Sequence, residues 1–108
     1  MRILLDECVH AGLKAAFPGH EVRTVTEMGW RGTKDGLLLV FAEISFDVFV
    51  TIDRKLEHQQ NLKKLNLGVL VAHVRSNEIR SYRPIFAALL RAAETVKPGE
   101  LIHVQGEE

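Results

Sequence analysis

Short apolar runs alternate along the chain with segments whose apolar residues recur at helical spacing, and this alternation restricts the fold more than any other feature. The runs are rich in β-branched and aromatic residues or alternate with polar ones, as strands do. We predict strands at residues 3–5, 21–25, 47–52, 67–74 and 101–104.

The segments between these runs are predicted to be mainly helical. Residues 34–45 are apolar nearly all round, so we expect this helix to be well buried. Residues 78–96 carry the best amphipathic stripe, and Pro84 is expected either to kink this helix or to mark its true start. Residues 10–17 form a shorter helix, and residues 54–65 form a polar loop or helix.

The resulting order, β-α-β-α-β-α-β-α-β, indicates an α/β fold, because right-handed crossovers place helices on both faces of a parallel sheet. We therefore expect a three-layer α/β/α sandwich with a mainly parallel five-stranded sheet. The 108 residues suffice for one domain, placed at residues 1–105, with residues 106–108 as a disordered tail. The commonest order of five such strands, 2-1-3-4-5, puts the first strand beside the third.

Composition narrows the classes of function. Fourteen basic and fourteen acidic residues give a net charge of zero, which argues against a dedicated DNA-binding module but not against an enzyme with bound metal. The single cysteine, Cys8, excludes an intramolecular disulfide and suits a reducing, cytoplasmic compartment. No apolar run is long enough for a signal peptide or a membrane span.

Acidic residues follow two strands that the expected order makes neighbours. Asp6 and Glu7 follow the first strand, and Asp53 follows the third. Ligands of open parallel sheets bind beyond the carboxyl ends of the strands where the order reverses, and neighbouring strands lie about 4.8 Å apart. Asp6 and Asp53 could therefore share one ion, with Asp35 joining from the first turn of the second helix. Oxygen ligands of this kind suit Mg²⁺ or Mn²⁺.

Each acid also has a structural interpretation. An aspartate at a helix N-terminus is often only a cap, which applies to Asp35 more than to Asp6. An aspartate after a strand, such as Asp53, is often a turn residue.

Other residues near these acids could contact a ligand. Trp30 is either a lid over the core or a platform on which a base stacks. Arg54 and Gln60 could contact phosphate or simply solvate a helix. Cys8 is interpreted as a packing residue, because anionic neighbours suppress its reactivity. The five histidines have no zinc-ligand spacing.

Three motifs together resemble the DUF5615 group of PIN-like domains. They are Ile3-Leu4-Leu5-Asp6-Glu7, the loop at residues 29–32 that leads to Asp35, and Val50-Thr51-Ile52-Asp53-Arg54. The resemblance implies a PIN-like fold and a Mg²⁺- or Mn²⁺-dependent ribonuclease. Such domains are often the toxin half of a toxin–antitoxin pair, which implies a cognate antitoxin as a partner.

The resemblance assigns Asp6 and Glu7 to the first acidic position of the family, Asp35 to the second and Asp53 to the third. Two departures imply one metal instead of two, or weak catalysis. Cys8 stands where many members have Asn, and Lys55 stands where many have a second Asp, with Glu57 as a conceivable replacement.

The leading hypothesis is therefore a divalent-metal-dependent endoribonuclease with RNA as substrate. One alternative is a receiver-like signalling domain with Asp53 as phospho-acceptor, although the hydroxyl and lysine expected after strands four and five are missing. The other is a catalytically inert PIN-like binding module. A homodimer is also conceivable, through the apolar stripe of residues 78–96.

Overall fold

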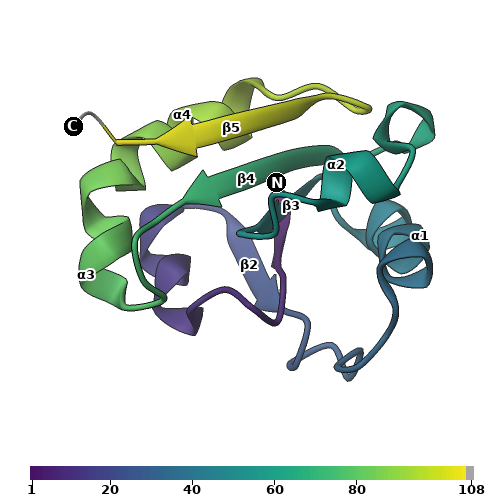
Figure 1. Cartoon of the computed structure of the whole chain (residues 1–108), viewed down its shortest axis with the longest axis horizontal. Coiled ribbons are helices and arrows are strands. Elements are labelled where there is room, and N and C mark those ends of the chain that lie inside the picture. Colours follow the sequence, from purple (N-terminus) through teal and green to yellow (C-terminus); the bar gives the residue numbers. More distant parts are fainter. Residues whose placement is uncertain (107–108) are drawn as a thin grey trace.

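The computed structural model describes residues 1–106, and its centre is a five-stranded sheet in which every strand is parallel to its neighbours (Figure 1). The strand order is β2-β1-β3-β4-β5, so the predicted order and the predicted α/β architecture are confirmed. Of the expected tail, Gly106 follows the last strand, and residues 107–108 lie outside the described residues. The strands are β1 (Arg2–Leu5), β2 (Glu21–Thr24), β3 (Val48–Thr51), β4 (Gly68–His73) and β5 (Leu101–Gln105).

Helices cover both faces of the sheet. The first face carries η1, α3, η3 and α4, and the second carries α1, α2 and η2. In Figure 1, α1 and α2 lie on the right and α3 and α4 on the left. The α-helices are α1 (Asp35–Ser45), α2 (Leu56–Gln59), α3 (Ile79–Tyr82) and α4 (Phe86–Thr95), and the 3-10 helices are η1 (Ala11–Ala16), η2 (Leu62–Lys64) and η3 (Arg83–Ile85).

Strand β1 shows why an unbroken apolar run is needed at the centre of this sheet. Ile3 and Leu5 belong to the core on the first face, and Leu4 belongs to the core on the second face. All three are fully buried, and burying such a side chain contributes roughly 1.5–3 kcal/mol. The apolar run ends at Leu5, so the polar side chain of Asp6, which follows β1, lies at the carboxyl edge of the sheet.

The helix predicted over residues 78–96 is interrupted near Pro84, where the sequence predicted a kink or the true start of the helix. The chain forms α3, η3 and α4 in succession, with Pro84 in the first turn of η3. Proline has no N–H to donate, and its ring clashes with the carbonyl four residues earlier, so the α-helical hydrogen bonding stops there. Of the two outcomes expected for Pro84, the start of the long helix close to this residue is the better description.

Of two shorter segments, the first differs from expectation in its helix type and the second agrees with it. The segment at residues 10–17 contains a 3-10 helix, in which His10 Nδ1 accepts a hydrogen bond of 2.9 Å from the Gly12 N–H. Leu13 and Ala16, three residues apart, fall on one face of such a helix, and both are buried. The segment at residues 54–65 contains two short helices, α2 and η2.

The expected burial of the helix at residues 34–45 is wrong for one of its faces. Leu38, Leu39 and Ala42 of α1 are buried against the sheet. A second stripe stays in solvent, because each side of the helix is apolar and only one side can face the sheet. The exposed fractions are 53% for Leu37, 45% for Val40 and 76% for Ile44.

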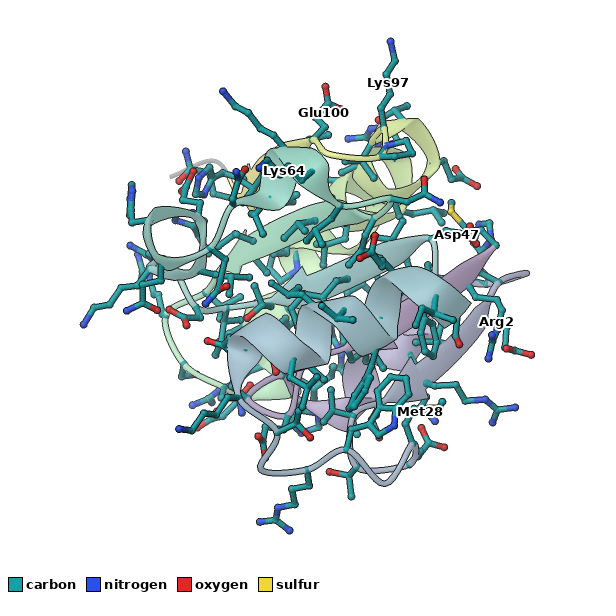
Figure 2. The ribbon with its side chains drawn as sticks, turned by 90° about the vertical axis from the view of Figure 1, so that its right-hand side faces the viewer. Arg2, Met28, Asp47, Lys64, Lys97 and Glu100 are labelled. Atoms are coloured by element: carbon teal, nitrogen blue, oxygen red, sulfur yellow. The ribbon has the colours of Figure 1, made fainter. Side chains whose placement is uncertain are left out.

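Arg2 and Asp47 connect the starts of β1 and β3 at the amino-terminal edge of the sheet (Figure 2). The Arg2 N–H donates to Asp47 Oδ2 at 2.8 Å, and the Asp47 N–H donates to the Arg2 carbonyl at 2.8 Å. The Arg2 side chain donates to the Ser45 carbonyl and lies over the ring of Phe46. These contacts hold the register of β1 against β3, which decides what meets at the opposite edge.

None of the helices within residues 1–106 has the length and apolar character that crossing a membrane requires.

Candidate functional site

The carboxylate of Asp6 is held in a largely buried position where β1 ends. Asp6 is 9% exposed, and its N–H extends the sheet by donating to the Val50 carbonyl at 2.9 Å. Three donors fix its side chain: the Thr51 hydroxyl reaches Oδ2 at 2.8 Å, the Cys8 thiol reaches Oδ2 at 3.5 Å, and the Glu7 N–H reaches Oδ1 at 2.9 Å. Among the described residues, Asp6 forms no ion pair with a basic side chain.

Burial raises the pKa of Asp6 above its usual value, because the surrounding groups exclude the water that would solvate its charge. The hydrogen bonds from Thr51, Glu7 and Cys8 oppose this effect, whereas the negative charge of Asp35 adds to it. Asp35 therefore lies within electrostatic range of Asp6. Two carboxylates in a poorly solvated place favour a proton or a cation between them.

Asp53 is connected to Asp6 through Thr51. Strand β3 ends at Thr51, and the hydroxyl of Thr51 accepts a hydrogen bond of 3.1 Å from the Asp53 N–H while it donates to Asp6. Asp53 Oδ1 accepts from the Lys55 N–H at 2.9 Å, as in an Asx turn, and Oδ2 has no hydrogen-bond partner within residues 1–106. Asp53 is thus a turn residue that keeps one carboxylate oxygen available.

Glu7 faces the loop that follows β2. Its Oε1 accepts from the Gly32 N–H at 3.3 Å, and its Oε2 lies 3.8 Å from Arg31 Nε. Glu7 therefore takes part in loop contacts, and only its backbone N–H contacts the Asp6 carboxylate.

Two polar side chains that follow Asp53 have different positions. Gln60 lies beside the start of α1, since a Cβ placed on Gly36 would be 3.4 Å from Gln60 Oε1. Because Gly36 follows Asp35 directly, Gln60 is also close to Asp35 in space. Glu57 instead accepts a hydrogen bond of 2.6 Å from His103 of β5, at the far side of the sheet from β1. The Glu57 side chain therefore contacts β5.

Trp30 packs against α1. Its ring lies 5.5 Å from the ring of Phe41 and 6.1 Å from that of Phe46, measured between centroids. With a rise of about 1.5 Å per residue, Phe41 is about 9 Å along the helix from Asp35. This position suits a lid over the core and gives no support to a base-stacking role beside the acids.

Asp6 and Asp53 each keep a carboxylate oxygen that is open to a ligand. Within residues 1–106, no group of three or more His, Cys, Asp or Glu side chains is arranged to hold a metal ion. Asp6 Oδ1 accepts one hydrogen bond and keeps a lone pair, and Asp53 Oδ2 is available. Mg²⁺ typically binds one or two carboxylates and completes its shell with water and substrate phosphates.

A pocket of about 650 Å³ lies at the carboxyl ends of β4 and β5. In Figure 1 the arrowheads of these two strands point towards α3, which forms one wall. We call it the arginine pocket, and its lining residues are Arg54, His73, Val74, Arg75, Arg80, Ser81, Pro84, Ile85, Gln105 and Gly106. Only Arg54 among them could be predicted from the sequence, because the other residues come from segments that the fold alone brings together.

A chain of hydrogen bonds leads away from this pocket across β5. His73 Nε2 lies 2.8 Å from His103 Nδ1, and His103 Nε2 donates to Glu57 Oε1 at 2.6 Å. Burial lowers the pKa of His73, and the positive charges of Arg54 and His103 lower it further, while Glu57 raises it. Sequence spacing gave no sign of this pair, since the contact depends on the register of β4 and β5.

Comparisons of the chain with family models, with curated proteins and with solved structures found no match.

Proposed function

We propose that this chain is a divalent-metal-dependent endoribonuclease that acts at the carboxyl ends of β1 and β3. The observation that carries the proposal is the carboxylate of Asp6, which is largely buried, fixed by three donors and near Asp35 with no basic partner within residues 1–106. It lies where the strand order reverses, the usual ligand position in an open parallel sheet.

Asp6 and Asp53 would hold Mg²⁺ or Mn²⁺, with Asp35 as a ligand directly or through water. Such an ion lowers the pKa of a bound water and offsets charge that builds on the phosphate. Thr51 orients Asp6 through its hydroxyl, and Arg54 holds a phosphate next to the one that is cleaved. Gln60 is close enough to the start of α1 to contact the substrate there.

One ion is favoured over two. Lys55 occupies the position of the second acid, and Glu57 is engaged with His103. Glu7 is engaged with the loop at residues 29–32. The protein ligands for a second ion are therefore lacking among these side chains, and a second ion would have to arrive with the substrate.

The biological part of the proposal rests on the resemblance to PIN-like domains. It comprises RNA as the substrate, a role as the toxin of a toxin–antitoxin pair, and a cognate antitoxin as partner. A cytoplasmic location is proposed from the single cysteine. A homodimer is also proposed. The stripe of residues 78–96, through which it was expected, is buried in the core on the first face of the sheet, so the apolar face available for a homodimer is the exposed side of α1.

The test is a titration of Mn²⁺ against thermal stability together with an RNA cleavage assay. Mass action stabilises the folded state by roughly 2.7 kcal/mol when Mn²⁺ is at a hundred times its dissociation constant. Asp6→Asn and Asp53→Asn are each expected to abolish both the stabilisation and the cleavage. Asp47→Asn is the matched control, because the same chemical change is made at the opposite edge of the sheet and the amide oxygen of Asn can still accept the hydrogen bond from the Arg2 N–H.

The outcomes separate the three hypotheses. Cleavage that survives both Asp6→Asn and Asp53→Asn would refute the proposal. Stabilisation by Mn²⁺ without cleavage would favour the inert binding module. A gain of one phosphoryl group in intact mass, after incubation with a small phosphodonor, would favour the receiver-like domain.

A further inference from the structure

Three arginines line the arginine pocket. Arg54 follows β3, Arg75 follows β4, and Arg80 belongs to α3, so three separate segments contribute. No acidic side chain is among the residues that line it. The chain as a whole carries no net charge, so this concentration of positive charge is a local property of the fold.

These guanidinium groups are largely available to a ligand. Arg80 pairs with Glu78, and the Arg80 side chain remains 79% exposed. Arg54 and Arg75 have no ion-pair partner within the part of the chain that the structure describes. Arginine stays charged at every physiological pH and matches phosphate oxygens with two parallel N–H donors. An anion bound here would relieve the mutual repulsion of the three charges.

One residue of the pocket is next in the chain to the acids at β1 and β3. Arg54 lines the pocket, and its neighbour in the chain is Asp53. Pro84 and Ile85 add an apolar wall, which suits the apolar face of a ribose or a base. A polyanion that entered the pocket would extend along the same edge of the sheet towards Asp6.

We propose that the arginine pocket binds the backbone phosphates of a single-stranded RNA segment that flanks the cleaved bond. The choice of RNA rests on the proposed function, but the pocket and its charge do not. Arg75 and Arg80 are thereby assigned as substrate-binding residues in addition to Arg54.

The test is binding of a short single-stranded RNA to the full chain in EDTA, measured by fluorescence anisotropy at several salt concentrations. Without a divalent ion the strand is not cleaved, so binding is read separately from chemistry. Arg75→Gln with Arg80→Gln in one chain is expected to weaken binding about a hundredfold, since two charge-assisted contacts are lost. The slope of log affinity against log salt should fall by about 0.7 for each arginine removed.

Arg91→Gln is the matched control, because Arg91 is an exposed arginine of α4 that does not line the pocket. It is expected to bind RNA as the unchanged chain does. Arg75 and Arg80 are both exposed, so we expect their replacement to leave the fold intact. Circular dichroism of each variant checks this.

The same loss per arginine removed in the double variant and in Arg91→Gln would overturn the proposal, since the effect would then be one of overall charge. Absence of RNA binding by the unchanged chain at low salt would also overturn it. Adenosine monophosphate serves as competitor, and displacement of the strand by an equal concentration of it would show a site for single phosphates instead. Failure of the nuclease proposal looks different: RNA then binds through the pocket in EDTA, but Mn²⁺ brings no cleavage.

Discussion

The hydroxyl of Thr51 donates a hydrogen bond of 2.8 Å to the carboxylate of Asp6 between the adjacent strands β3 and β1, and both residues are buried. The same hydroxyl accepts from the Asp53 N–H at 3.1 Å. One oxygen atom therefore connects the two aspartates that we propose as metal ligands, and it does so without being a ligand itself.

Replacement of that hydroxyl tests this link. Thr51→Val keeps the shape of the side chain but leaves the Asp53 N–H without its partner and Asp6 Oδ2 with only the weak thiol donor of Cys8. We expect a loss of about 1–3 kcal/mol in the free energy of unfolding, measured with urea. Thr51→Ser keeps the hydroxyl and removes one methyl group, so its loss should be about 0.8 kcal/mol. Equal stability of the two variants would contradict the connecting role.

Asp6→Asn is expected to reveal the cost of the buried charge. Burial raises the pKa of Asp6 in the folded chain above the unfolded value of about 3.9. At a pH between the two pKa values, the folded state therefore binds more protons than the unfolded state does. The contribution of Asp6 to stability is therefore fully present below about pH 3.9 and is lost as pH rises through the raised pKa.

The measurement is the difference in unfolding free energy between Asp6→Asn and the unchanged chain, in EDTA, from pH 4 to pH 8. The variant should gain relative stability as pH rises and then reach a plateau. The difference between the two chains is the useful quantity, since the other carboxylates titrate in both. A difference that is flat across this range would mean that Asp6 is not desolvated.

His73, which lines the arginine pocket, has a pKa that two substitutions should shift in opposite directions. Positive charge on Arg54 is one cause of the lowered pKa of His73, and Glu57 opposes it. Arg54→Gln should therefore raise the pKa of His73, and Glu57→Gln should lower it, as followed by NMR of the imidazole protons. Because the folded-state pKa is below the unfolded value of about 6.5, the contribution of His73 to stability is lost as pH falls below about 6.5. Shifts of the same sign in both variants would disprove this account.

Two glycines with the same backbone conformation separate conformational strain from steric clash. Gly19 has φ +84°, and a Cβ added there would meet no atom within 4 Å, whereas Gly99 has φ +82° and its Cβ would lie 2.8 Å from the Lys63 carbonyl oxygen. Gly19→Ala should cost about 1–2 kcal/mol from the left-handed conformation alone. Gly99→Ala should cost about 1–3 kcal/mol more, because the backbone of Lys63 must move. Thermal or urea unfolding of the two variants measures the difference.

The sheet could be predicted because its strands are buried on both faces. The runs at Leu4, Phe49 and Val69 are apolar without interruption, which only central parallel strands require, and the alternation with helices leaves few possible orders. The break at Pro84 was foreseeable as an alternative from the missing N–H. The exposed face of α1 could not be foreseen, because hydropathy does not tell which side of a helix that is apolar all round faces the sheet.

The acids could be located from sequence, but their partners could not. Asp6 and Asp53 follow strands, so topology alone brings them to one edge. Arg75 and Arg80 belong to a turn and to a helical segment of four residues, and nothing in their spacing indicates a common pocket with Arg54. That information resides in the packing of α3 against the ends of β4 and β5, which depends on contacts distant in sequence.

The exposed stripe of Leu37, Val40 and Ile44 on α1 affects the solubility of the protein. At pH 7 the chain carries no net charge, so two molecules that approach each other meet no long-range repulsion before these side chains touch. Solubility should thus be lowest near neutrality and should rise on either side of it. Ile44→Lys, which places a charge at the most exposed position of the stripe, should keep concentrated samples clear at pH 7.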